Sequence, residues 1–139
     1  MAELVFFYGT LMTPFNRPGR RRIDDHLAFK GRGSIAAALF DLGIYPAAVP
    51  AADTRVRGEV YEMTQPLVVL HVLDDTEGYR PGEPETSLYT RLLTPVLLDD
   101  GGMVDAWVYF YNARIDRAER IASGDYLEYL RAKCRCGSL

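Results

Sequence analysis

Hydrophobic residues occur along the chain in short runs that end at glycine, proline or aspartate. Residues 3–8, 33–43 and 54–63 have the apolar, partly alternating composition of β-strands, and the last of these alternates in the manner of a half-buried strand. Residues 88–98 and 103–111 are apolar runs on either side of "DDGG", a pattern typical of a β-hairpin. Strands are therefore expected to outnumber helices.

Two segments have the pattern of helices instead. Residues 64–79 offer Thr64 as an N-cap, Pro66 in the first turn and Gly78 as a terminating residue. Residues 123–133 form a shorter amphipathic pattern, after which the tail to residue 139 follows. Because strands and helices do not alternate regularly, the order favours an α+β fold around a curled, mostly antiparallel sheet over a doubly wound one.

Length and composition are those of a single globular domain over residues 1–139, with 48% hydrophobic and 25% charged residues. A net charge of -3 disfavours a broad nucleic-acid-binding surface. The basic stretch at residues 17–22 precedes Asp24 and Asp25, so it is interpreted as a solvated loop or helix start. No leader and no apolar stretch of membrane-spanning length occur, which predicts a cytoplasmic protein that does not bind a membrane.

The residues that commonly carry metals or nucleophilic chemistry are few. The histidines are His26 and His71, and the cysteines, Cys134 and Cys136, stand one residue apart near the end of the chain. A disulfide between them would be strained, and a metal site would need distant histidines. No signature of a serine hydrolase, zinc protease, phosphate loop or dinucleotide-binding fold is present. Neither a metal nor a disulfide is expected.

Glu77 is the carboxylate that stands out. On a helix it shares a face with Leu70 and Leu73, so it is expected to point inward. Burial would raise its pKa, and both Asp74 and the negative end of the helix would raise it further, which makes a stronger base. The alternative is that Glu77 belongs to the polar residues 74–76 and frays into solvent.

Gly9 interrupts the first strand early. We interpret this break as a place where the backbone turns away and exposes successive N–H groups, which form a concavity suited to a carboxylate or an oxyanion. The alternative is an ordinary turn at the end of a strand.

Five short motifs, in this order and spacing, resemble those of the γ-glutamylcyclotransferase-like proteins, which include the γ-glutamylamine cyclotransferases. The resemblance covers about residues 4–111, and its motifs are "FYGTLM" (7–12), "LFDLGIYPAAV" (39–49), "VRGEVYEM" (56–63), "LDDTEGY" (73–79) and "LYTR" (88–91). It implies a small mixed, mostly antiparallel β-barrel with flanking helices.

The resemblance also implies an activity: the α-amine of a γ-glutamyl group attacks its own γ-carbonyl, which releases 5-oxoproline and an amine without a metal or cofactor. It makes Glu77 the acid/base. The residues it implies for binding the γ-glutamyl substrate are Tyr8, Gly9, Thr10, Leu11 and Tyr89. Arg91 lies in the "LYTR" motif together with Tyr89. For Arg91, both a contact with the substrate and a structural ion pair are open.

Three alternatives remain at this point. The domain could bind a small molecule without catalysis, because one fold hosts many functions. The aromatic strand at 107–111 could serve as an interaction surface, which predicts an exposed apolar patch. Residues 80–87 form a loop that is either a lid or an idle surface loop. The leaving amine, the oligomeric state and any role of the arginine-rich stretch are open.

Overall fold

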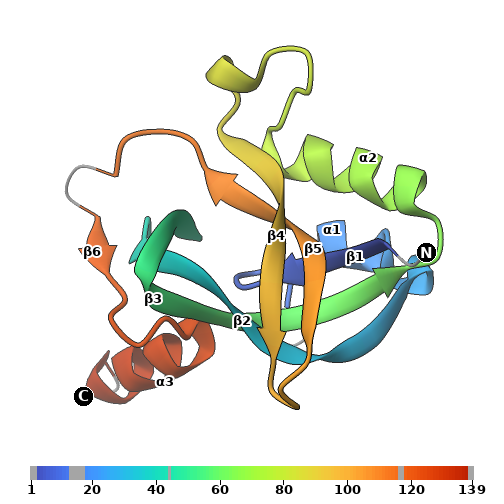
Figure 1. Cartoon of the computed structure of the whole chain (residues 1–139). Helices are drawn as coiled ribbons and strands as arrows, with labels where there is room; N and C mark the ends of the chain where they lie inside the picture. The colour runs from blue at the N-terminus through green and yellow to red at the C-terminus, as the bar shows by residue number, and fades with distance from the viewer. Residues whose placement is uncertain (1–2, 13–17, 44, 116–117, 138–139) are drawn as a thin grey trace.

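The computed structural model describes residues 3–12, 18–43, 45–115 and 118–137 (Figure 1). Its strands are β1 (Glu3–Phe7), β2 (Leu27–Asp41), β3 (Pro46–Met63), β4 (Tyr89–Leu98), β5 (Met103–Tyr111) and β6 (Glu119–Arg120). Its α-helices are α1 (Pro18–Arg21), α2 (Pro66–Glu77) and α3 (Tyr126–Gly137), and its 3-10 helices are η2 (Asp24–His26) and η3 (Pro84–Thr86).

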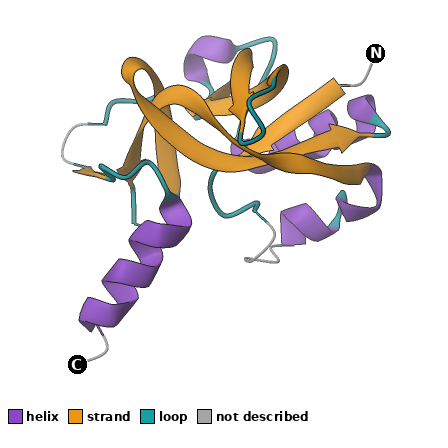
Figure 2. Ribbon diagram, turned by 60° about the horizontal axis from the view of Figure 1, so that its bottom comes forward, coloured by secondary structure: helices purple, strands orange, loops and turns teal. Residues whose placement is uncertain are grey.

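The strands close into a small barrel. Neighbouring strands pair in the order β3-β1-β5-β4-β2, and β2 pairs again with β3, so the sheet returns on itself. β1 and β5 are parallel, with Val5 opposite Trp107, and the other pairs are antiparallel. The short β6 adds to the end of β2. Figure 2 shows the strands curling around one another while α3 projects from one end. The predicted mixed, mostly antiparallel barrel with flanking helices is confirmed.

Large apolar side chains fill the interior of this barrel and the layer beneath α2. The fully buried ones are Val5, Phe6, Met12, Ile23, Ile35, Leu39, Val56, Val60, Val69, Leu73, Val96 and Val108. Four apolar residues of α2 are buried: Val69, Leu70, Val72 and Leu73. His71, which lies between them in the sequence, is exposed. Burial of this stripe fixes which face of α2 points toward the sheet.

The two ends of α2 differ in how well the sequence predicted them. Pro66 opens the helix, where its missing N–H costs nothing, but the cap residue is Gln65 and not Thr64. The N–H of Thr64 instead donates to the carbonyl of His26, which holds Thr64 outside the helix. Gly78 ends the helix in the left-handed conformation with φ 68°, as predicted.

The outward face of β3 is not the exposed face that its alternation predicted. Glu59 and Tyr61 are buried, and the Tyr61 hydroxyl donates to the Glu59 carboxylate over 2.9 Å. Arg20 of α1 lies over this face, with its guanidinium 4.3 Å from the centre of the Tyr61 ring and its Nη1 donating to the carbonyl of Leu11. The expectation of a solvated basic stretch is wrong at Arg20, because a flat guanidinium can stack on an aromatic ring. The two arginines that follow it are exposed.

The predicted β4–β5 hairpin is confirmed, with residues paired in register from Tyr89 and Tyr111 to Leu97 and Met103. The aromatic strand is part of the barrel wall, because residues 108–110 are buried and their flanking aromatics are half-buried. The large apolar side chains that this hairpin exposes lie elsewhere on it: Leu92, Leu93, Leu97 and Met103. The alternative of an interaction surface at 107–111 is therefore wrong, and these aromatics pack in the sheet instead.

The last helix is longer than expected. Asp125 caps α3 by accepting a hydrogen bond from the N–H of Glu128, and the helix runs to Gly137, beyond the predicted end at residue 133. Cys134 and Cys136 therefore lie in its last turn, although their side chains are outside the described residues. Arg17 is outside them as well. Within the described ranges, no helix is both long enough and apolar enough to cross a membrane.

Candidate functional site

A pocket of about 500 Å³ opens at the end of β1. Its walls are the chain just after β1, the start of β3, the last turn of α2, and parts of β4 and β5. The described residues that line it are Phe6, Phe7, Tyr8, Gly9, Thr10, Leu11, Pro18, Tyr45, Pro46, Thr76, Glu77, Leu88, Tyr89 and Tyr109. This volume suits a small-molecule ligand, since such sites typically enclose about 300–1,000 Å³.

All six residues proposed from the sequence lie on this one pocket. Tyr8, Gly9, Thr10 and Leu11 follow β1, Tyr89 begins β4, and Glu77 ends α2. Sequence reasoning did not single out Tyr45, Pro46, Leu88 or Tyr109. Tyr45 and Pro46 fall within one of the quoted motifs, so that motif could have indicated them, whereas nothing in the sequence distinguished Tyr109 from the other aromatics of β5.

Gly9 is required for a different reason from the predicted one. Its φ is not positive, so the turn does not depend on the left-handed backbone that glycine favours. A Cβ at this position would lie 2.7 Å from Cγ of Pro46, closer than packed carbon atoms approach. The N–H of Met12 donates to the Gly9 carbonyl over 3.0 Å and closes the turn. Glycine is needed here because β3 begins directly against this backbone.

Glu77 points inward, as the helix period predicted. Leu70 and Leu73 on the same face are buried, and Glu77 is half-buried at the pocket, while Thr76 beside it is exposed. The alternative in which Glu77 frays into solvent is therefore wrong. A left-handed Gly78 follows at once and turns the chain away from the pocket.

Two buried tyrosines, Tyr8 and Tyr89, line the pocket together with Glu77. The Tyr8 hydroxyl donates to the carbonyl of Tyr109 over 2.7 Å and accepts from the N–H of Ala48. The Tyr89 hydroxyl donates to the carbonyl of Pro46 over 3.1 Å. Burial, and then the negative charge of Glu77, raise the pKa of Tyr8. Burial also raises the pKa of Tyr89, followed by the neighbouring Tyr8 and Glu77. Both phenols are neutral at physiological pH.

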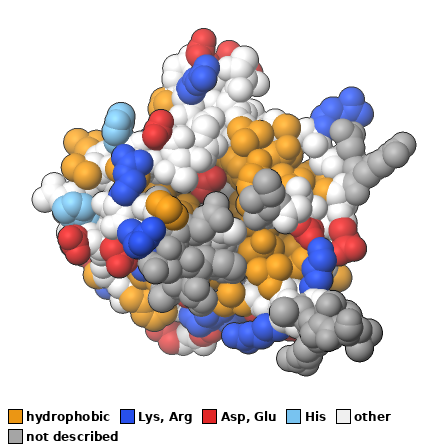
Figure 3. All heavy atoms as spheres, turned by 180° about the vertical axis from the view of Figure 1, so that it is seen from behind, with side chains coloured by type: hydrophobic (Ala, Val, Ile, Leu, Met, Phe, Trp, Pro, Cys, Tyr) orange, Lys and Arg blue, Asp and Glu red, His pale blue; other side chains and the backbone are white. Residues whose placement is uncertain are grey.

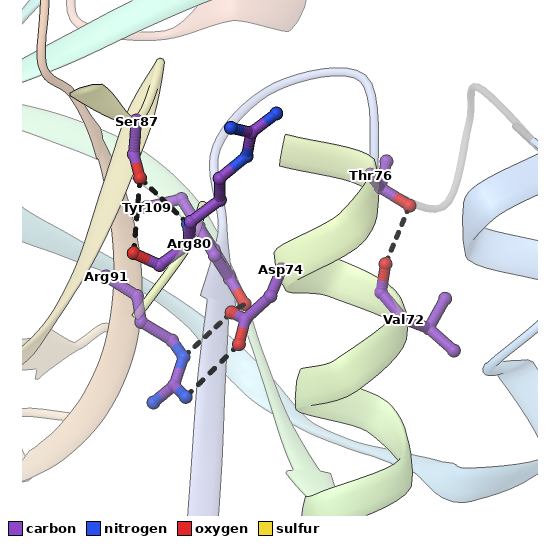
Figure 4. Close-up of polar contacts among 7 residues, drawn as sticks. All are labelled: Val72, Asp74, Thr76, Arg80, Ser87, Arg91 and Tyr109. Carbon is purple, nitrogen blue, oxygen red and sulfur yellow. Dashed lines mark hydrogen bonds and ion pairs between the residues drawn. The ribbon is translucent and has the colours of Figure 1, made fainter. Parts of the chain in front are cut away.

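The carboxylate of Asp74 is held by two strands (Figure 4). Nε of Arg91 lies 2.8 Å from Oδ1 of Asp74, and the Tyr109 hydroxyl donates to the same oxygen over 2.6 Å. Of the two roles open for Arg91, the structure shows structural pairing. Because Arg91 offsets its charge, Asp74 repels a charge on Glu77 less than the sequence led us to expect.

The loop at 80–87 folds back on itself. The Ser87 hydroxyl accepts from the N–H of Arg80 over 2.8 Å and donates to the carbonyl of Glu83 over 3.0 Å. Of residues 80–83 and 85–87, none lines the pocket; Leu88, just after the loop, does. The described side chains of this loop therefore contribute no wall to the site.

On one face of the molecule, charged side chains of the two signs lie side by side. On the face seen in Figure 3, hydrophobic side chains gather toward the middle, and basic and acidic ones lie interspersed near the edge. In the part of the chain that the structure describes, no three His, Cys, Asp or Glu residues come together in a way that could hold a metal ion. Among the described lining residues, the polar side-chain groups are the hydroxyls of threonine and tyrosine and the Glu77 carboxylate.

Comparison with known proteins agrees with this architecture. The family described as "Gamma-glutamyl cyclotransferase, AIG2-like" matches residues 5–128. A curated protein of Methanocaldococcus jannaschii named "Putative gamma-glutamylcyclotransferase MJ1514" is 29% identical over 128 residues, which are 91% of this chain and 98% of that protein.

Solved structures show the same likeness. YkqA from Bacillus subtilis superposes with a TM-score of 0.72 at 25% identity, over 97% of this chain and 43% of YkqA, so this chain spans less than half of that protein. An AIG2-like protein from Mus musculus superposes with a TM-score of 0.61 at 28% identity, over 81% of this chain and 80% of that one. The chain therefore belongs to the gamma-glutamyl cyclotransferase, AIG2-like family.

Proposed function

We propose that this protein is a γ-glutamylcyclotransferase that converts a γ-glutamyl amide into 5-oxoproline and a free amine. The observation that carries the proposal is the position of Glu77. It is the one carboxylate among the described lining residues, and it lines the same partly apolar, aromatic pocket as the turn at residues 8–11. A carboxylate that faces a cavity rather than solvent is suited to acid/base catalysis.

In this reaction the nucleophile belongs to the substrate. Glu77 removes a proton from the α-ammonium group, and the freed amine attacks the γ-carbonyl carbon to close a five-membered ring. The tetrahedral intermediate collapses when the bond to the leaving nitrogen breaks, and Glu77 returns its proton to that nitrogen. The ring nitrogen loses its second excess proton to the released amine, so the products are the neutral lactam ring of 5-oxoproline and an ammonium ion. Correct orientation of an intramolecular attack can supply roughly 7–11 kcal/mol of barrier reduction, so the protein needs few reactive groups.

The turn at residues 8–11 would bind the anionic part of the substrate. Its four residues line the pocket, and backbone amides of such a turn would suit the α-carboxylate or the developing oxyanion. The hydroxyls of Tyr8 and Tyr89 already donate to backbone carbonyls, and their raised pKa values keep the protons in place. We therefore assign these two tyrosines to shaping the pocket and the proton transfers to Glu77.

The test is release of 5-oxoproline from a panel of γ-glutamyl amino acids, γ-glutamyl amines and glutathione. Glu77→Gln keeps the shape of the side chain but removes its base, so we expect kcat to fall by about 10²–10⁴-fold. Asp75→Asn, an exposed carboxylate on the same helix, is the matched control and should keep full activity.

The panel also identifies the leaving amine, as the substrate with the highest kcat/KM. If Glu77→Gln is folded and as active as the wild type, the assignment of Glu77 is wrong. If the wild type binds γ-glutamyl compounds without converting any of them, the protein is a binding domain on the same fold.

A further inference from the structure

Asp74 lies one helical turn before Glu77 and joins the last part of α2 to β4 and β5 through polar contacts. Its carboxylate accepts from Nε of Arg91 at 2.8 Å, from Nη2 of Arg91 at 3.3 Å and from the Tyr109 hydroxyl at 2.6 Å. The Asp74 and Arg91 side chains are only 13% and 19% exposed, so water competes little for these contacts.

The two donors to Asp74, Arg91 and Tyr109, are also held in place by the sheet itself. Arg91 and Tyr109 are directly opposite each other in the β4–β5 register, so both project from the same face of the sheet toward α2. The Arg91 guanidinium also lies 4.7 Å from the Trp107 ring centre and 5.6 Å from that of Tyr79. Tyr79 comes two residues after Glu77, so contacts with Arg91 are made on both sides of the catalytic position.

Tyr109 contacts the other half of the pocket as well. Its backbone carbonyl accepts the hydrogen bond of the Tyr8 hydroxyl, and Tyr8 is the first residue of the turn proposed to bind the substrate. One residue of β5 therefore holds this turn through its backbone and the last turn of α2 through its side chain.

We propose that Tyr109, Asp74 and Arg91 are positioning residues that set the distance between Glu77 and the turn at residues 8–11. This inference rests on the proposed cyclotransferase function. The three side chains act through Glu77, because their polar groups are directed at one another and not at the substrate. Loosening them lets the last turn of α2 move relative to Tyr8, and misplacement of a catalytic group slows the chemical step even where binding persists.

The experiment compares Tyr109→Phe and Arg91→Lys with two matched controls. Tyr129→Phe also removes a phenol that donates to a carboxylate, that of Asp41, over 2.6 Å. Arg57→Lys, like Arg91→Lys, removes a bidentate pair between a guanidinium and a carboxylate. Nη1 and Nη2 of Arg57 lie 2.6 and 2.8 Å from the carboxylate oxygens of Asp99. None of these control residues lines the pocket. For each variant, kcat and KM for 5-oxoproline release and the thermal midpoint are measured.

A second readout does not depend on activity. The N–H of Tyr79 donates to the carbonyl of Asp74 over 2.8 Å, so the hydrogen exchange rate of this amide reports opening of the last turn of α2. In Tyr109→Phe and Arg91→Lys we expect faster exchange at Tyr79 and a kcat lowered by about tenfold, with KM changed less than about twofold. In the controls we expect neither change.

The inference is overturned if the two site variants leave kcat and exchange at Tyr79 unchanged, or if kcat falls equally in the controls of similar thermal midpoint. A wild-type protein that converts no substrate refutes the proposed function instead. In that case, the exchange rates still decide whether these three residues hold the end of α2.

Discussion

Gly9 stands where a single carbon atom decides the shape of the pocket. Replacement by alanine would place a Cβ 2.7 Å from Pro46, so either the turn or the start of β3 must shift. We expect Gly9→Ala to destabilise the protein by about 1–3 kcal/mol, as overpacking does. We also expect kcat/KM to fall by about tenfold, because the turn proposed to bind the substrate is displaced.

Gly82→Ala is the control for this substitution. Gly82 lies in the loop after α2, and nothing stands within 4 Å of the position of its Cβ. Urea denaturation and 5-oxoproline release are compared for both variants. Equal stability and activity of Gly9→Ala and Gly82→Ala would show that the turn tolerates a side chain.

The end of α2 is the element on which the site depends. Gly78 adopts φ 68°, which places an L-residue in a strained conformation, and it directly follows Glu77. We expect Gly78→Ala to cost about 1 kcal/mol of stability. Because the strain is relieved by rearranging the last turn, kcat should fall as well.

Substitution of a second glycine with positive φ distinguishes an effect on stability from an effect on activity. Gly101 lies in the β4–β5 turn with φ 95° and open space around it, so Gly101→Ala carries a similar strain away from the pocket. Both variants are expected to lose a similar amount of stability in urea, but only Gly78→Ala should lose activity. A parallel loss of kcat in both would mean that activity follows global stability and not the geometry of this helix end.

The whole molecule contains nine tyrosines, and burial raises the pKa of Tyr8, Tyr89 and Tyr109. Near the pocket these shifts are increased by Glu77, and for Tyr109 by its hydrogen bond to Asp74. In the unfolded chain a phenol ionises with a pKa of about 10. Above that pH the unfolded state therefore binds fewer protons than the folded state.

The stability contributed by these phenols is therefore complete below about pH 10 and declines as the pH rises further. We expect the free energy of unfolding to decrease above this pH, and Tyr8→Phe to decrease less steeply. Phenolate absorbance should show that some of the nine tyrosines ionise only when the protein unfolds. Ionisation of all nine while the circular dichroism stays native would contradict this prediction.

Patterns of neighbouring residues predicted the local elements well. The hairpin and the Gly78 end of α2 follow from periodicity and turn chemistry, which act over a few residues. The strands expected at 33–43 and 54–63 are present, but β2 runs from Leu27 to Asp41 and β3 begins at Pro46, so both starts were missed. The N-cap at Thr64 was wrong because a tertiary hydrogen bond to His26 competes for its backbone. The barrel itself was indicated by resemblance, since closure also needs pairing of β1 with β5 and of β2 with β4 across long separations that periodicity does not encode.

The sequence alone determined that Glu77 would share the buried face of a helix, because 3.6-residue periodicity ties its direction to Leu70 and Leu73. Only the tertiary structure decided what surrounds it. Arg91 reaches Asp74 across 17 positions, and Tyr8 reaches Tyr109 across 101. The charge that Asp74 presents to Glu77, and the distance from Glu77 to the turn at residues 8–11, depend on such contacts. They form when the barrel closes, and no local pattern contains them.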